Sequence, residues 1–131
     1  MPGIMDLKQL LASLDPELVA GEFVFCSVAL AWTDSRGLQP VATFREREGL
    51  TLVLPKQEAE LAGLVFDGVF RQITLRVHSN LQAVGLTASV SAQLAARGIS
   101  ANVIAAYYHD HIFVPAARAE EALQALRELG G

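Results

Sequence analysis

One segment, from Ile73 to Pro115, constrains the fold of this chain more than any other part of the sequence. It begins with alternating apolar and polar residues, 73–78, which is the pattern of a strand buried on one face. Apolar residues then recur at every fourth position, as they do along the buried side of a helix. These residues are Leu86, Val90 and Leu94. The predicted helix begins near Leu81 and ends at Gly98, because glycine suits the backbone conformation of a helix end.

The rest of this segment predicts a hairpin followed by another helix. Residues 99–108 form the next strand, His109 and Asp110 occupy the tip, and residues 111–114 return as the third strand. Pro115 suits the first turn of a helix, because proline lacks an N–H group that this turn would leave unpaired. The order strand, helix, strand, strand, helix is that of a ferredoxin-like α+β sandwich, with helices on one face of an antiparallel sheet.

A similar order of elements recurs earlier in the chain, displaced by 60 residues. Residues 52–55 (LVLP) align with residues 112–115 (IFVP), and each group precedes a predicted helix. The first copy has only a loop around Trp32 where the second has its long helix. Such self-similarity indicates two copies of one structural unit. We therefore predict a truncated first half, residues 1–70, and a complete second half, residues 71–131.

The elements of the first half follow from the same kinds of pattern. An apolar stripe at helical spacing predicts a helix over residues 7–14. A short turn over residues 17–20 and a buried strand over residues 22–30 follow, the strand being rich in Phe and Val. A hairpin with a charged tip spans residues 41–54, and a helix begins at Pro55.

Composition favours a protein that associates with further copies of itself. Hydrophobic residues make up 52% of the 131 residues and charged residues 18%, which is more apolar material than a monomer of this size usually hides. The net charge of −4 and the absence of a basic run argue against nucleic acid as a partner. We therefore expect a homo-oligomer, at least a dimer.

The sequence gives no sign of a membrane or an export signal. The N-terminus lacks a basic stretch followed by an apolar core, and a single cysteine fits a reducing compartment. The long uncharged run over residues 77–96 contains too many polar side chains for a lipid-spanning helix. We expect a cytoplasmic protein that does not bind membranes.

Four motifs resemble the ACT domain family of small-molecule regulatory modules, and in particular bacterial proteins with two tandem ACT-like halves. They are GEFVF at 21–25, REREGLTLVLP at 45–55, VHSNLQAVGLTA at 77–88 and GISANVIAAYYHDHIFVP at 98–115. The resemblance implies that an amino acid binds between paired units, at the loop after the first strand and at the edge of the second strand. The implied ligand-binding residues are His78, Ser79, Asn80, Leu81, Ala83, Val84, Gly85, Leu86, Asn102, Val103, Ile104, Tyr107, His109, Asp110 and His111.

The chemistry of the loop is compatible with such a site. The start of a helix leaves backbone N–H groups unpaired, and the helix dipole favours an anion such as a carboxylate there. Gly85 has no side chain that would block a close approach. Alternatively, Ser79 and Asn80 only cap the helix, and Gly85 only allows the helix to pack tightly on the sheet.

The three histidines support a different hypothesis. In the predicted topology the first and third strands are antiparallel neighbours, which would bring His78 near His111, with Asp110 and His109 just beyond. Imidazole and carboxylate groups bind divalent metals, and a metal-activated water would suggest a hydrolytic enzyme. The sequence has no phosphate-binding loop, nucleophile elbow or zinc-protease motif. A purely structural assembly module is a third possibility. We adopt the regulatory binding protein, with no catalytic residue, cofactor or metal assigned.

Overall fold

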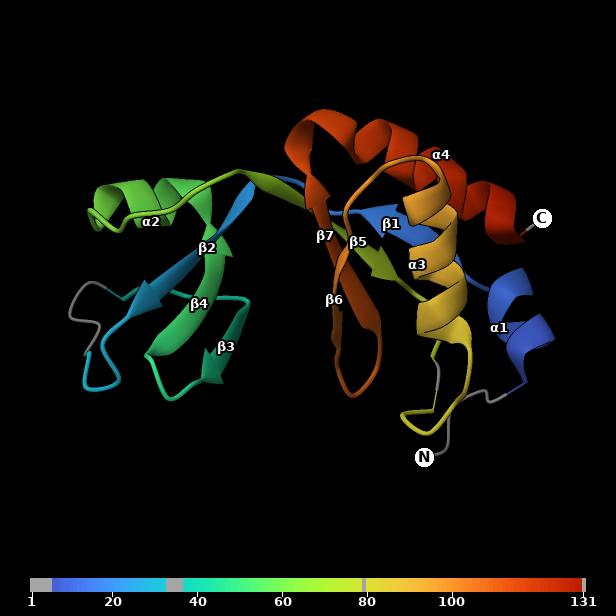
Figure 1. Cartoon of the computed structure of the whole chain (residues 1–131), viewed down its shortest axis with the longest axis horizontal. Helices are drawn as coiled ribbons and strands as arrows, with labels where there is room; N and C mark the ends of the chain where they lie inside the picture. Colours follow the sequence, from blue (N-terminus) through green and yellow to red (C-terminus); the bar gives the residue numbers. More distant parts are fainter. Residues whose placement is uncertain (1–5, 33–36, 79, 131) are drawn as a thin grey trace. The chain divides into compact units, whose positions relative to one another are not determined.

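The chain folds into two compact units, and a computed structural model describes residues 6–32, 37–78 and 80–130 (Figure 1). One unit is Gly21–Phe70, here called the central unit. The other combines Met1–Ala20 with Arg71–Gly131 and is here called the terminal unit. The predicted division after residue 70 coincides with a boundary between the units, but the segment before Gly21 packs with the second half of the chain. No helix among the described residues is long and apolar enough to cross a membrane.

The terminal unit has the ferredoxin-like strand order that the sequence predicted. Its sheet order is β1-β5-β7-β6, which is the order 4-1-3-2 of the fold, with the fourth strand supplied from the N-terminal part of the chain. Three α-helices complete one hydrophobic core with this sheet. The elements are α1 (Leu7–Ala12), β1 (Pro16–Leu18), β5 (Phe70–Leu75), α3 (Leu86–Ala96), β6 (Asn102–Ala105), β7 (Asp110–Pro115), the short 3-10 helix η1 (Ala116–Arg118) and α4 (Ala119–Gly130).

The sequence pattern located this core correctly. The alternating residues of β5 and its extension place Ile73, Leu75 and Val77 in the core, and all three are buried. The three residues of the predicted helical stripe, Leu86, Val90 and Leu94, are the buried residues of α3. The α+β fold class is therefore confirmed in the terminal unit.

The strand β1 was not predicted, because the sequence suggested a turn over residues 17–20. Residues 16–18 pair antiparallel with β5, Pro16 opposite Leu75 and Leu18 opposite Ile73. Three residues are too few to show a period, and proline is tolerated as the first residue of an edge strand. Tertiary pairing with β5, rather than local preference, makes this segment a strand.

The helix α3 begins five residues later than predicted, at Leu86 rather than near Leu81. The side chain of Asn80 accepts a hydrogen bond from the Gln82 N–H (2.8 Å), and the Ala83 N–H donates to the Asn80 carbonyl (2.9 Å). Asn80 therefore stabilises a turn instead of capping the helix. Gly85 precedes the helix with a positive φ of 99°, which a residue with a side chain adopts only with strain.

The hairpin of the terminal unit is also displaced from its predicted position. The strand β6 is shorter than the predicted residues 99–108, and the turn lies at residues 106–109, closed by a hydrogen bond from the Ala106 N–H to the His109 carbonyl (3.0 Å). Asp110 is consequently the first residue of β7 and not part of the tip. Because side chains alternate between the two faces along β7, the side chain of Asp110 lies on one defined face of the sheet.

The central unit contains the truncated copy. Its strands are β2 (Phe23–Val28), β3 (Ala42–Arg45) and β4 (Leu50–Pro55), in the order β3-β4-β2, and Phe70 pairs with Phe23 at the other side of β2. The helix α2 (Lys56–Leu61) follows β4 directly. No helix lies between β2 and β3 in the described residues. A small core including Val24 and Leu54 holds this unit together.

The 60-residue repeat predicted from the sequence holds at the level of strand register. β3 and β6 span residues 42–45 and 102–105, and the pairs Ala42–Val53 and Asn102–Phe113 occupy equivalent positions. The turn in the central unit is likewise closed by a hydrogen bond from the Glu46 N–H to the Gly49 carbonyl (2.8 Å). Two repeats of one structural unit, the first truncated, are therefore confirmed.

The assignment of the core can be tested with two leucines of different exposure. Leu94 is fully buried in the terminal unit, whereas Leu81 is 63% exposed in the same unit. Replacement Leu94→Ala should lower the free energy of unfolding by about 2–5 kcal/mol, because it leaves a cavity. The control Leu81→Ala should change it by less than about 0.5 kcal/mol. Urea unfolding followed by circular dichroism measures both, and equal effects would contradict this core.

Candidate functional site

The start of α3 is the first part of the candidate site. The N–H groups of the first helical turn, residues 86–88, have no partner within the helix, and no side chain among the described residues caps them. The next N–H, that of Ser89, donates to the Gly85 carbonyl (2.9 Å). The first turn of α3 therefore has free hydrogen-bond donors and the positive end of the helix dipole.

The other α-helices in the described part of the chain have a carboxylate where α3 has none. The Asp6 side chain accepts a hydrogen bond from the Lys8 N–H at the start of α1 (3.1 Å). The first turns of α2 and α4 contain Glu58 and Glu120, respectively. The first turn of α3 has no acidic residue, so an external anion would meet no repulsion from its own turn.

The loop before α3 is uncharged and partly apolar. Residues 80–96 contain no Asp, Glu, Lys or Arg. Leu81 is 63% exposed and Val84 is 81% exposed. Gly85 allows the loop to lie close to α1, because a Cβ atom added there would lie only 3.2 Å from the Leu7 Cδ2 atom. Ser79, also predicted as a ligand-binding residue, lies outside the described residues.

The second part of the candidate site is the edge strand β6. This strand pairs with β7 and ends the sheet order, so its other edge has unpaired backbone groups. Val103 and Ile104 are half-buried, and Val103 packs against the core. The Asn102 Nδ2 atom donates to the Phe113 carbonyl (3.3 Å), so this side chain is already engaged within the hairpin.

Aromatic contacts connect the loop to the β6–β7 turn. The ring centroids of His78 and Tyr108 lie 5.6 Å apart, and those of Tyr108 and Tyr107 lie 5.0 Å apart. Both tyrosines are exposed. The loop after β5 and the turn after β6 therefore meet at one end of the terminal unit, as the ferredoxin-like topology requires.

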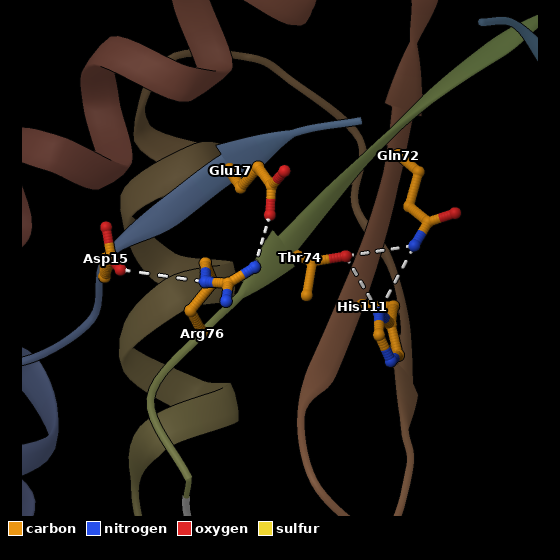
Figure 2. Close-up of polar contacts among 6 residues, drawn as sticks. All are labelled: Asp15, Glu17, Gln72, Thr74, Arg76 and His111. Atoms are coloured by element: carbon orange, nitrogen blue, oxygen red, sulfur yellow. Dashed lines mark hydrogen bonds and ion pairs between the residues drawn. The ribbon is translucent and has the colours of Figure 1, made fainter. Parts of the chain in front are cut away.

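His111 does not lie where the alternative metal-binding cluster would require it. Figure 2 shows its ring beside β5, where the Nδ1 atom lies 3.0 Å from the Thr74 hydroxyl oxygen and 3.3 Å from the Gln72 amide nitrogen. The same amide nitrogen donates to the Thr74 hydroxyl oxygen (3.0 Å). His78 contacts Tyr108 instead of joining this network. The sequence did not predict Gln72 and Thr74 as partners of His111, because their pairing depends on strand register.

Burial lowers the pKa of His111, and the neighbouring His109 lowers it further. The neutral ring can then accept a hydrogen bond from the Thr74 hydroxyl at Nδ1, while that hydroxyl oxygen accepts a hydrogen bond from Gln72. An unprotonated Nδ1 atom can accept from both groups, and the lowered pKa of His111 favours this neutral form. The contacts with β5 hold His111 on the polar face of the sheet.

A second polar group joins β1 to β5. The Arg76 Nη1 atom lies 2.8 Å from Glu17 Oε1, and its Nε atom lies 3.9 Å from Asp15 Oδ2 (Figure 2). All three side chains are exposed, and such surface ion pairs contribute little to stability. The sequence analysis did not predict these ion pairs, because it did not predict the strand β1.

The structure gives no support to the metal hypothesis. Among the described residues, no three His, Cys, Asp or Glu side chains are arranged to hold a metal ion. The rings of His109 and His111 lie 6.5 Å apart. Asp110 is only 8% exposed, and burial raises its pKa, an effect that His111 and His109 oppose. The described residues therefore do not show the cluster that the alternative metal hypothesis required.

Acid should destabilise the protein through His111. The folded pKa lies below the ordinary value of about 6.5, so between these values the unfolded chain binds more protons, and stability decreases as the pH falls through this range. His111→Gln should reduce the loss of stability between pH 7 and pH 5.5, because an amide oxygen can accept from Thr74 without titrating. Thermal unfolding at several pH values measures this loss, and an unchanged slope in the variant would exclude His111 as its source.

Comparison with known proteins agrees with the fold and repeats described above. Two ACT domain models match the sequence, over residues 2–71 and 69–128. A crystal structure from Vibrio cholerae, of a protein of unknown function described as a possible transport protein, is 57% identical with a TM-score of 0.86. The alignment covers 95% of this chain and 96% of that chain. No curated protein sequence matches.

More distant structural similarity extends to aspartate kinases. The ligand-free regulatory subunit of aspartate kinase from Thermus thermophilus has 12% identity and a TM-score of 0.67, covering 89% of this chain and 97% of that chain. Escherichia coli aspartokinase III, in complex with aspartate and ADP, has 14% identity and a TM-score of 0.61, covering 87% and 32%, respectively. At this identity the similarity shows the fold alone. The two family matches, which together span residues 2–128, and the close relative from Vibrio show that this chain belongs to the ACT domain family.

Proposed function

We propose that this protein is a regulatory module that binds an amino acid at the start of α3 and responds through association of its subunits. ACT membership supports a regulatory, ligand-binding role in general. The observation that favours this particular place is the uncapped first turn of α3, with no acidic residue. The name of the Thermus protein, a regulatory subunit, is consistent with such a role.

An amino acid carries a negatively charged carboxylate, which the first turn of α3 lacks. Its α-carboxylate can accept hydrogen bonds from the free N–H groups of residues 86–88, and hydrogen bonds to an ionised acceptor are stronger than those between neutral groups. The helix dipole adds to the attraction. The remaining predicted ligand-binding residues, from His78 to Leu86 and along β6, would surround the rest of the ligand.

The open edge of β6 supports association with a second copy of the chain. An edge strand of four residues with unpaired backbone groups can continue its sheet into that of another subunit. The exposed Leu81, Val84 and Tyr107 would gain a covering surface. A ligand shifts such an equilibrium only if it binds one state more tightly, so the site must change on assembly.

The remaining parts of the proposal follow from the same role. The protein is cytoplasmic, catalyses no reaction and passes its signal to another protein. Its repeats are residues 1–70 and 71–131, as the family matches suggest, and residues 1–20 complete the sheet of the second repeat. Neither nucleic acid nor a membrane is a partner.

The proposal predicts that a negative charge in the first turn of α3 competes with the ligand. Ala88→Glu places a carboxylate beside the free N–H groups, whereas Ala92→Glu makes the same chemical change one turn later, and both alanines are exposed. After a thermal-shift screen of the twenty amino acids, titration calorimetry with the best binder should show Ala88→Glu weakening affinity at least about tenfold. Ala92→Glu should change it less than about threefold.

The two variants also control for folding. Ala88→Glu should unfold at the same or a slightly higher temperature, because an acidic residue stabilises a helix start. Binding that is equally strong in wild type and Ala88→Glu would place the ligand elsewhere. If no amino acid raised the midpoint of unfolding or bound to the wild type, the amino-acid function would be wrong.

A further inference from the structure

A surface cavity of the terminal unit lies between the end of α1 and the end of α4. Its volume is about 340 Å³, and its lining comes from the connection between α1 and β1 and from the last turns of α4. This volume is within the range of small-molecule sites. The residues that line the cavity are not those of the candidate site at the start of α3. The cavity is therefore separate from that site.

The close approach of the two helix ends gives the cavity its walls. Gly130 ends α4 beside α1, and a Cβ atom there would lie 2.7 Å from the Leu11 carbonyl oxygen (Figure 1). Leu14 and Leu126 contribute apolar lining, and they are only 2% and 0% exposed, respectively. Small-molecule sites are typically pre-formed, with an apolar lining and a few polar groups that orient the ligand.

The connection between α1 and β1 supplies hydrogen-bond acceptors. The carbonyl of Ala12 cannot continue the helical pattern, because Pro16, four residues later, has no N–H group. No other N–H group in the described part of the chain donates to this carbonyl. The Asp15 Oδ2 atom lies 3.9 Å from the Arg76 Nε atom, and Arg76 donates a hydrogen bond to Glu17 instead (2.8 Å). Ala12 and Asp15 can therefore accept hydrogen bonds from a ligand.

The cavity also contains a positive charge that the fold leaves unpaired. Arg127 lies in the last turn of α4, and its side chain is exposed. Within the described ranges it forms no ion pair, although Asp15 lines the same cavity. A guanidinium group can bind a carboxylate through two parallel hydrogen bonds. One cavity thus has acceptors on the connection after α1 and a carboxylate-binding group on α4.

These groups together define the chemical class of the ligand. An ammonium group has three N–H donors, and the negative dipole ends of α1 and α4 attract it. We propose that the cavity binds a small zwitterion, with its ammonium group on Asp15 and the Ala12 carbonyl and its carboxylate on Arg127. Asp15 and Arg127 are the charged residues of the described lining, so a third charge on the ligand would find no opposite group there. The inference goes beyond the proposed function, because it concerns a second site.

Three zwitterions of increasing length test this site: glycine, β-alanine and 4-aminobutanoate. Titration calorimetry compares each with the amine and the carboxylate that lack one of its two charged groups, such as propylamine and butanoate for 4-aminobutanoate. The wild-type chain should bind the best zwitterion at least about tenfold more tightly than either comparison compound, because each of these leaves one charged group of the cavity unpaired. NMR titration of the same chain should shift the amide signals of residues 12–16 and 126–130.

Variants of the two charged residues test their roles. Asp15→Asn and Arg127→Gln each remove one charge at an exposed position, and each should weaken the best zwitterion at least about tenfold. The matched controls Asp67→Asn and Arg47→Gln make the same chemical changes at exposed positions of the central unit and should alter the affinity less than about threefold. Ala88→Glu, in the first turn of α3, should also leave it unchanged.

The opposite results would overturn the second site. Equal affinity for the zwitterion and its comparison compounds would do so, as would NMR shifts confined to the start of α3. Binding that is weakened by Ala88→Glu, but not by Asp15→Asn or Arg127→Gln, would overturn this inference and leave the proposed function standing. Binding of none of the three zwitterions would also overturn it, and the screen of the twenty amino acids would still decide the proposed function. If a variant were unfolded, the NMR shifts of the wild-type chain would decide.

Discussion

The terminal unit depends on the strand β5 and on the strict alternation of its side chains. Ile73 and Leu75 are buried on the face toward the helices, and Thr74 between them is held on the other face by His111. The strand also pairs with β1, which brings the N-terminal segment into the same sheet. Because side chains alternate with a period of two, a shift of one residue would exchange the two faces, so the register of β5 fixes both the core and the polar sheet face.

Polar groups are distributed unequally around this core. Several charged side chains form exposed ion pairs, such as Arg76 with Glu17, that contribute little to stability. The first turn of α3 differs, because no side chain among the described residues caps its N–H groups. It lies at the end of the unit where the loop after β5 and the turn after β6 meet. The amino-acid carboxylate proposed to bind there would supply the acceptors that these N–H groups lack.

The difference between the two repeats explains why the site is expected in only one of them. The central unit retains the three strands and the helix after Pro55, but it has no helix between β2 and β3 in the described residues. Without that helix there is no free first turn and no dipole to attract a carboxylate. The truncated repeat keeps a hydrophobic core and the same hairpin register.

The sequence by itself determined the fold class, the repeat and the core. Periods of two and about four in apolar residues are local properties, so Ile73, Leu75, Leu86 and Leu94 could be placed without coordinates. The tertiary structure alone decided three things: that residues 16–18 form a strand, that α3 begins at Leu86, and that Asp110 is buried while His111 binds Thr74. Each depends on contacts between residues far apart in the chain, or on whether a residue such as Asn80 forms a turn or caps a helix. Local patterns do not contain that information, because these alternatives are close in energy until the sheet register selects one.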